Sequence, residues 1–220
     1  MPSTAIAGSH AFRVFSLMAA SALTAFSQGT VVFNNLNAVR APIILTPLRF
    51  SQLQGQPTVT IANSTPTGTT DYGVGAAPAD GTGFTAEMWA GADAASLTAV
   101  TGSQTPLRTG STAGYVTQIA TLAIAQITPG NSGTLQVRAW DNNNGAITSW
   151  AAAIAGGNLR ARGQSATWVN ATGGAGVPPS APAGLTGWTA FNIFSPVPEP
   201  SMIALGALGL GALLLRRRKA

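Results

Sequence analysis

Residues 134–140 read Thr134-Leu-Gln-Val-Arg-Ala-Trp140, and this stretch decides the fold class. Leu135, Val137 and Ala139 alternate with Gln136, Arg138 and Trp140. Successive side chains of a β-strand point to opposite faces, so a period of two predicts a strand with one apolar and one polar face. The same alternation recurs at residues 30–34 and 84–89. The chain is therefore expected to be mainly β.

Turn residues divide these segments. Pro129-Gly-Asn-Ser-Gly133 predicts a tight turn, and we expect a hairpin between residues 115–127 and the strand from Thr134. Asn142-Asn-Asn-Gly145 predicts a second turn, because Asn and Gly tolerate positive φ. Residues 148–157, rich in Ala and ending in Gly156-Gly157, favour a short helix. Two late strands are expected at 164–170 and 186–194.

Length and composition favour one β domain between two terminal segments. The chain has 220 residues, 45% of them hydrophobic and 8% charged, and no Cys. Residues 28–195 are long enough to bury a core without disulfides. Short strands with frequent turns predict an antiparallel β-sandwich, immunoglobulin-like or jelly-roll. We expect this domain to be flanked by an N-terminal signal helix and a C-terminal transmembrane helix, for the reasons given below.

The net charge of +5 is concentrated at the ends of the chain. Four consecutive cations lie at 216–219 and Arg13 lies near the N-terminus, whereas residues 28–195 carry six Arg against five acidic residues. Nucleic-acid binding needs cations spread over a folded face. We therefore expect no nucleic-acid partner.

Residues 1–27 have the layout of a secretory signal peptide. A weakly cationic start is followed by the apolar stretch 14–26 and by small residues. Ala25 and Ser27 fit the −3 and −1 positions, which predicts cleavage by signal peptidase before Gln28. The alternative is a buried N-terminal helix.

The C-terminal end combines an apolar run with a basic tail. The fourteen residues 202–215 would form a helix of about 21 Å, shorter than the ~30 Å hydrocarbon core. Length alone would allow a buried core helix. Four cations follow the apolar run directly: Arg216, Arg217, Arg218 and Lys219. Such a basic cluster acts as a membrane stop and favours a transmembrane helix whose C-terminal end lies in the cytoplasm.

Just before that run lies a short motif: Val197, Pro198, Glu199, Pro200 and Ser201. The order of motif, apolar segment and basic tail over residues 196–220 resembles the PEP-CTERM sorting signal of Gram-negative bacteria. The resemblance implies export, transient tethering to the inner membrane and processing by a membrane-embedded exosortase that recognises Pro198, Glu199 and Pro200. Prolines on both sides of Glu199 keep the segment extended, which suits a protease. A rigid spacer before a simple anchor is the alternative.

Residues 28–215 contain no His, Cys or Lys. Nucleophilic triads, thiol catalysis, Schiff bases and His or Cys zinc sites all lack a required residue. Paired carboxylates are the one remaining catalytic route, and their spacing does not support it. We expect no enzyme activity, no cofactor and no metal; Asp141 to Gly145 fits a turn better than a calcium loop.

Tryptophan offers a different hypothesis. Trp89 shares a strand face with Glu87, and Trp140 shares one with Arg138. Aromatic rings stacking on sugars beside charged groups would make a carbohydrate site, whereas the alternative is that these rings fill the core.

The leading expectation is an exported, exosortase-processed protein of the cell surface or extracellular matrix with a non-catalytic β domain. The alternatives are an exopolysaccharide-binding module and a permanently anchored envelope protein.

Overall fold

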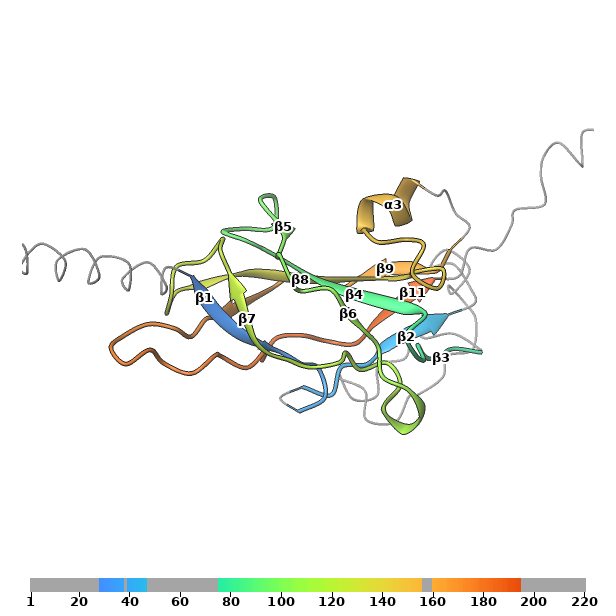
Figure 1. Cartoon of the computed structure of the whole chain (residues 1–220), viewed down its shortest axis with the longest axis horizontal. Helices are drawn as coiled ribbons and strands as arrows, with labels where there is room; N and C mark the ends of the chain where they lie inside the picture. Colours follow the sequence, from blue (N-terminus) through green and yellow to red (C-terminus); the bar gives the residue numbers. More distant parts are fainter. Residues whose placement is uncertain (1–27, 38, 47–74, 156–159, 195–220) are drawn as a thin grey trace, which may run out of the picture.

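The computed structural model describes residues 28–37, 39–46, 75–155 and 160–194, and these are mainly β. Figure 1 shows the strands arranged in two layers, with the short helix α3 (Trp150–Ala155) on the outside of one layer. The whole of the predicted signal peptide (1–27) and the whole of the sorting segment (196–220) lie outside the described residues.

Two long antiparallel strands form the centre of the larger layer. They are β4 (Phe84–Gly91) and β8 (Ser132–Asp141), which pair from Phe84↔Asp141 to Gly91↔Thr134. The side chains on their inner face are fully buried: Ala86, Met88, Ala90, Leu135, Val137 and Ala139. The alternation predicted for both strands is therefore confirmed.

The larger sheet has the strand order β3-β2-β11-β9-β8-β4-β5, with β10 also pairing with β8 and β6 with β4. The remaining strands of this sheet are β2 (Ile43–Thr46), β3 (Ala77–Pro78), β5 (Thr98–Ala99), β6 (Thr105–Pro106), β9 (Arg162–Gln164), β10 (Trp168–Ala171) and β11 (Phe191–Phe194). β11 and β2 pair in parallel, from Phe191↔Ile43 to Phe194↔Thr46. The sheet is thus mixed, and the expectation of purely antiparallel pairing is wrong at this pair.

The second sheet consists of β1 (Gly29–Phe33) and β7 (Ile119–Ile124). The predicted hairpin between residues 115–127 and β8 is wrong, because β7 pairs with β1. The turn at 129–133 instead carries the chain from one layer to the other. Ile127 packs so closely against Gly133 that a Cβ at 133 would overlap the Ile127 side chain. A larger residue at 133 would therefore require the Ile127 side chain to move.

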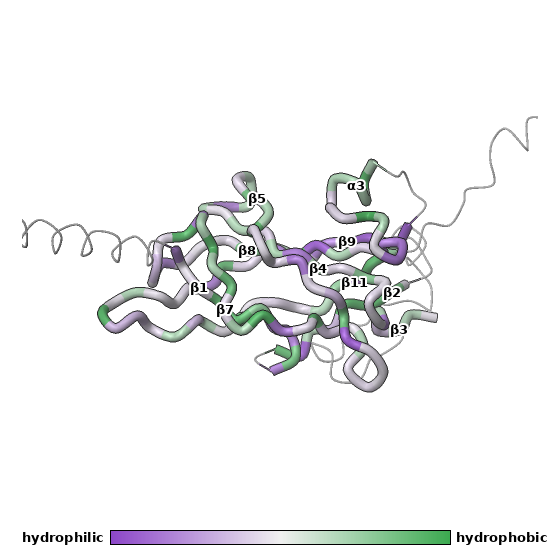
Figure 2. Tube along the Cα trace, in the orientation of Figure 1, coloured by the Kyte–Doolittle hydropathy of each residue, from purple (hydrophilic) through white to green (hydrophobic). Residues whose placement is uncertain are grey.

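One hydrophobic core joins the two layers. Val31 and Phe33 from β1 and Leu122 and Ile124 from β7 belong to the same buried cluster as the inner faces of β4 and β8. Figure 2 shows apolar residues along the strands that face each other. Burial of this apolar surface is the main source of stability in such a fold.

A buried asparagine fastens the connection after β1 to a segment about 80 positions further along the chain. The Asn35 amide donates to the carbonyl oxygens of Ala41 (2.8 Å) and Gly114 (3.2 Å), and its own oxygen accepts from the Val116 N–H (2.8 Å). The backbone N–H of Ile43 also donates to the carbonyl of Gly114 (2.7 Å). The segment after the 3-10 turn η2 (Gly110–Thr112) is therefore held against β2.

Candidate functional site

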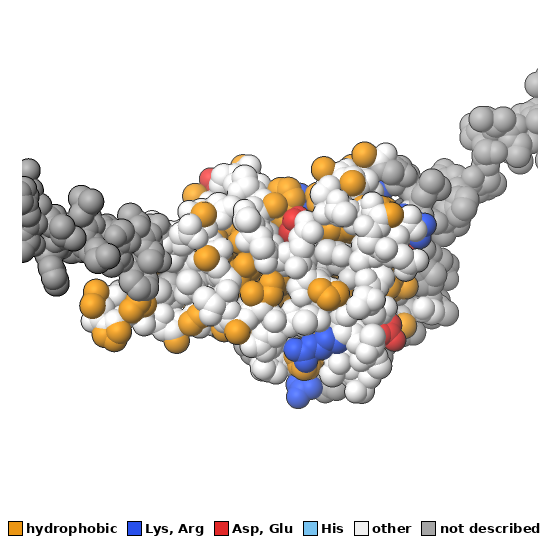
Figure 3. Space-filling model, viewed as in Figure 1, with side chains coloured by type: hydrophobic (Ala, Val, Ile, Leu, Met, Phe, Trp, Pro, Cys, Tyr) orange, Lys and Arg blue, Asp and Glu red, His pale blue; other side chains and the backbone are white. Residues whose placement is uncertain are grey.

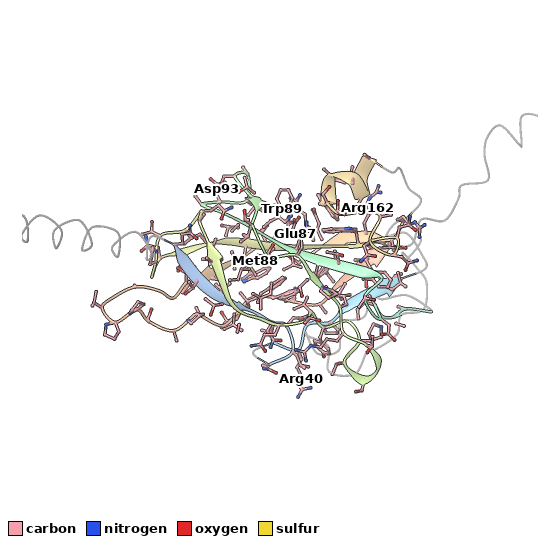
Figure 4. The ribbon with its side chains drawn as sticks, in the orientation of Figure 1. Arg40, Glu87, Met88, Trp89, Asp93 and Arg162 are labelled. Carbon is pink, nitrogen blue, oxygen red and sulfur yellow. The ribbon has the colours of Figure 1, made fainter. Side chains whose placement is uncertain are left out.

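The outer face of β4 and β8 brings together the four residues of the carbohydrate hypothesis. Glu87 and Trp89 come from β4, and Arg138 and Trp140 come from β8 two positions apart. Glu87 lies opposite Arg138 in the register. Figure 4 shows Glu87 and Trp89 on the side of the sheet where α3 lies, and Met88 on the side of β1 and β7.

The Glu87 carboxylate is buried, at 6% exposure, and both of its oxygens accept hydrogen bonds. Oε2 accepts from the indole N–H of Trp89 (2.8 Å), and Oε1 accepts from the side-chain amide of Gln104 (2.8 Å). The same amide donates to the carbonyl of Thr148 (3.1 Å). Glu87 therefore fixes the orientation of the Trp89 ring and links it to the loop before α3.

Arg138 lies over the Trp89 ring. Its guanidinium carbon is 3.6 Å from the centroid of Trp89 and 5.5 Å from that of Trp150, a cation–π arrangement. Its Nε donates to Oε1 of Gln136 (3.0 Å). Burial lowers the pKa of Arg138, and the nearby Glu87 carboxylate partly offsets this effect. One face of Trp89 is thus occupied by a cation, and the ring as a whole is half-buried.

Trp140 has to be removed from the set of stacking residues. Its side chain is 0% exposed, its indole N–H donates to the carbonyl of Ile147 (3.1 Å), and its ring meets that of Trp150 edge to face at 6.2 Å. The strand pattern placed Trp140 on the outer face correctly. That face is covered at this point by α3 and the loop that precedes it.

Helix α3 begins where the sequence predicts it. The Ser149 hydroxyl accepts from the N–H of Ala152 (3.1 Å), which satisfies one of the free donors of the first turn. Trp150 and Ala153, three positions apart, are the buried side chains of this helix. Trp150 covers Trp140 and also lies near Arg138, so the helix completes the site.

The Asp141–Gly145 segment forms a turn. Asn143, Asn144 and Gly145 have φ values of 51°, 54° and 89°. Arg160 donates to Oδ2 of Asp141 (3.2 Å) and to Oδ1 of Asn143. The two oxygens that a calcium loop would use thus face a guanidinium. Within the described residues, no cluster of three or more His, Cys, Asp or Glu side chains is placed to hold a metal.

Three members of the site were not predicted from the sequence: Gln104, Gln136 and Trp150. Gln136 stood in the alternating pattern of β8 and could have been found there. Gln104 lies 17 positions from Glu87, so only the tertiary structure reveals their contact. Trp150 is the first residue of α3. Because this helix has only six residues and most of them are Ala, the sequence does not show which side of the helix is buried.

The processing residues fall largely outside the described part of the chain. Gln28 is described, is exposed and directly precedes β1. The other predicted residues lie outside it: Ala25, Ser27, Val197, Pro198, Glu199, Pro200, Ser201, Arg216, Arg217, Arg218 and Lys219. Over the described ranges no helix has the length and apolar character needed to span a membrane, and residues 202–215 are not among them.

The described residues define a mainly β protein with a preorganised aromatic and charged cluster on one outer face. Residues 196–219 match the family model described as the PEP-CTERM protein-sorting motif. The chain therefore carries a PEP-CTERM sorting motif at residues 196–219, and this motif indicates export, membrane-associated sorting and an exosortase as processing partner. No curated protein and no solved structure gives a significant match.

Proposed function

We propose that the chain is an exported surface or extracellular-matrix protein whose β domain has no catalytic role. Signal peptidase cleaves before Gln28, the helix of residues 202–215 holds the chain in the inner membrane, and the exosortase acts near Pro198–Pro200. The observation that carries this proposal is the motif match over residues 196–219.

The positions of the strands are consistent with this route. β1 begins at Gly29 and β11 ends at Phe194, so both proposed processing regions lie beyond the strands that form the core. Removal of either terminal segment would leave every core strand in place. We also propose that the two layers form a sandwich-type domain that is complete before release.

The experiment compares motif variants in cells that produce the exosortase. Pro198→Ala with Pro200→Ala should keep the protein in the membrane fraction, because the extended segment that the enzyme grips is lost. Pro196→Ala is the matched control and should be released like the wild type. Release of the double variant at the normal rate would contradict the sorting proposal, and a tail retained on all chains would favour the permanently anchored alternative.

A second candidate function is polysaccharide binding at Trp89. The supporting observation is that Glu87 and Arg138 hold this half-buried ring in one orientation. Because the side chain is already ordered, binding a ligand would cost little further side-chain entropy. The part of the ring that remains exposed offers an apolar surface for the C–H groups of a sugar. Gln104, which is exposed, and Arg138, which is half-buried, supply polar groups beside it.

This second function is tested by affinity electrophoresis in the producer's own exopolysaccharide. Trp89→Phe should weaken the retardation of the protein and Trp89→Ala should abolish it, since the plane shrinks and then disappears. Trp168→Phe, which changes another half-buried Trp on β10, is the control and should migrate as the wild type does. Equal retardation of all variants would rule out Trp89 as the contact.

A further inference from the structure

The outer face of α3 carries no polar side chain. The helix reads Trp150-Ala-Ala-Ala-Ile-Ala155, and only Trp150 and Ala153 face the protein. The other four residues are exposed, with Ile154 at 49%. A surface helix usually presents polar residues to water. Figure 3 shows hydrophobic side chains gathered on the surface over α3.

α3 lies beside the point where the chain leaves the sheet. Phe194, the last residue of β11, pairs with Arg162 of β9. The Arg162 guanidinium donates to the carbonyl oxygen of Ala153 in α3 (2.8 Å). A short path of contacts therefore connects the end of β11 to the C-terminal half of the helix.

The distance from β11 to the apolar run is limited by the chain itself. Eight residues lead from Phe194 to Met202, and at ~3.3–3.6 Å per residue they span at most about 29 Å. Three of them, Pro196, Pro198 and Pro200, favour the extended polyproline conformation of about 3.1 Å per residue. A chain anchored at 202–215 therefore keeps this end of the domain close to the bilayer.

We propose that the exposed face of α3 contacts the lipid surface while the chain is tethered. This inference rests on the membrane anchoring in the proposed function. Ile154 enters the interface, with Ala151, Ala152 and Ala155 around it, as the apolar face of an interfacial helix does. Asp141 pairs with the nearby Arg160 at 3.2 Å, the Arg162 guanidinium donates to the carbonyl of Ala153, and the exposed face of α3 itself carries no charged residue. A neutral phosphatidylcholine surface should therefore be sufficient.

The chain provides a matched control at the other end of β8. Val169 of β10 is 68% exposed and lies opposite Thr134, whereas Arg162 beside α3 lies opposite Trp140. Because the sequence contains no Cys, Ile154→Cys and Val169→Cys each introduce a single labelling site. Both positions are exposed, so neither label disturbs the core.

The experiment uses the full chain reconstituted in phosphatidylcholine vesicles, with a polarity-sensitive fluorophore at one of the two cysteines. Flotation first establishes that the chain is bound to the vesicles. The label at 154 should then shift to shorter emission wavelengths and be quenched by brominated acyl chains, while the label at 169 should do neither.

Floated chains whose 154 label remains in water would overturn the α3 contact and leave the anchoring intact. Equal shifts at 154 and 169 would also overturn it, because the contact would then be unspecific. Chains that fail to float would contradict the anchoring itself, and the α3 contact with it. A shift at 154 that needs the exosortase in the vesicles would assign the face to a protein and overturn the lipid proposal.

Discussion

Asn35 illustrates how a single polar residue can hold distant parts of this β domain together. Replacing it by Ala removes three buried hydrogen bonds and leaves the N–H of Val116 without its partner. An unsatisfied buried group costs about 1–3 kcal/mol in addition to the lost bonds, so we expect a loss of roughly 3 kcal/mol in unfolding free energy. Urea titration measures it.

The matched control for Asn35 is Asn37→Ala, two positions away at an exposed site. It should change the unfolding free energy by no more than about 0.5 kcal/mol. If Asn35→Ala unfolds at the same urea concentration as Asn37→Ala, the role assigned to the buried amide is refuted.

Asp93 gives the domain an acid-dependent contribution to stability. Its carboxylate accepts from the backbone N–H groups of Ala95 and Ser96, both at 2.9 Å. The hydrogen bond from the Ser96 side chain, followed by these backbone bonds, holds the pKa of Asp93 below its usual range. A lowered pKa in the folded state means that the stabilisation is present above the unfolded pKa and is lost as the pH falls through the folded value.

We therefore predict that Asp93→Asn flattens the loss of stability below about pH 4. Denaturant midpoints measured for both proteins from neutral to strongly acidic pH test this. The two curves should differ above the unfolded pKa and converge at the acid end. Curves that stay parallel over the whole range would count against the assignment.

At the scale of elements, the junction between β9 and β11 depends on a close approach of two short strands. It has a single register pair, Phe194↔Arg162, and the strands approach closely at Gly163. A Cβ at Gly163 would overlap the carbonyl oxygen of Asn192 and approach Cα of Ile193 at 3.1 Å. Both obstacles are backbone atoms, so the strands would have to separate.

We expect Gly163→Ala to lower the unfolding free energy by about 2 kcal/mol, within the usual range for overpacking. Gly83→Ala is the control, because a Cβ at that position meets nothing within 4 Å and its φ is not positive. Thermal unfolding compares the two variants. Equal transition temperatures would show that β9 and β11 are not in the close contact described.

Sequence patterns predicted the faces of strands better than their partners. The alternation in β1, β4 and β8 identified which side chains point into the core between the two layers, since the direction of a side chain follows directly from the period of two. Pairing depends on where turns send the chain, and the glycine-rich turn at 129–133 looks alike whether it closes a hairpin or crosses between layers. The parallel pair of β2 and β11 joins segments almost 150 residues apart, which no local pattern encodes.

The candidate site was predicted in the same partial way. The strand pattern put Glu87 and Arg138 on the outward faces of their strands, and the pairing of β4 with β8 then places them opposite each other. The burial of Trp140 has a different cause, because it depends on α3 packing over the sheet. The strand predicted at 164–170 is divided between the end of β9 and β10. At Ser165 the backbone N–H still donates to the carbonyl of Val137 (2.8 Å), but the Val137 N–H donates to the Ser165 hydroxyl (3.0 Å), so a side chain replaces a backbone acceptor and the regular ladder ends there.

At the scale of the whole molecule, β11 limits where processing can occur. It pairs with β2 on one side and β9 on the other, and Phe191 and Ile193 are buried in the core. A cut within or before β11 would remove part or all of an internal strand. The sorting motif begins only a few residues later, so the domain and its processing signal are closely spaced but separable.

The most direct test of the account is the intact mass of the extracellular protein, taken from cells with and without the exosortase. With the enzyme, the mass should correspond to a chain that begins at Gln28, retains Phe194 and lacks residues 216–219. Without the enzyme, the tail should remain and the protein should stay in the membrane. An extracellular protein that still carries Arg216-Arg217-Arg218-Lys219 would contradict the central claim.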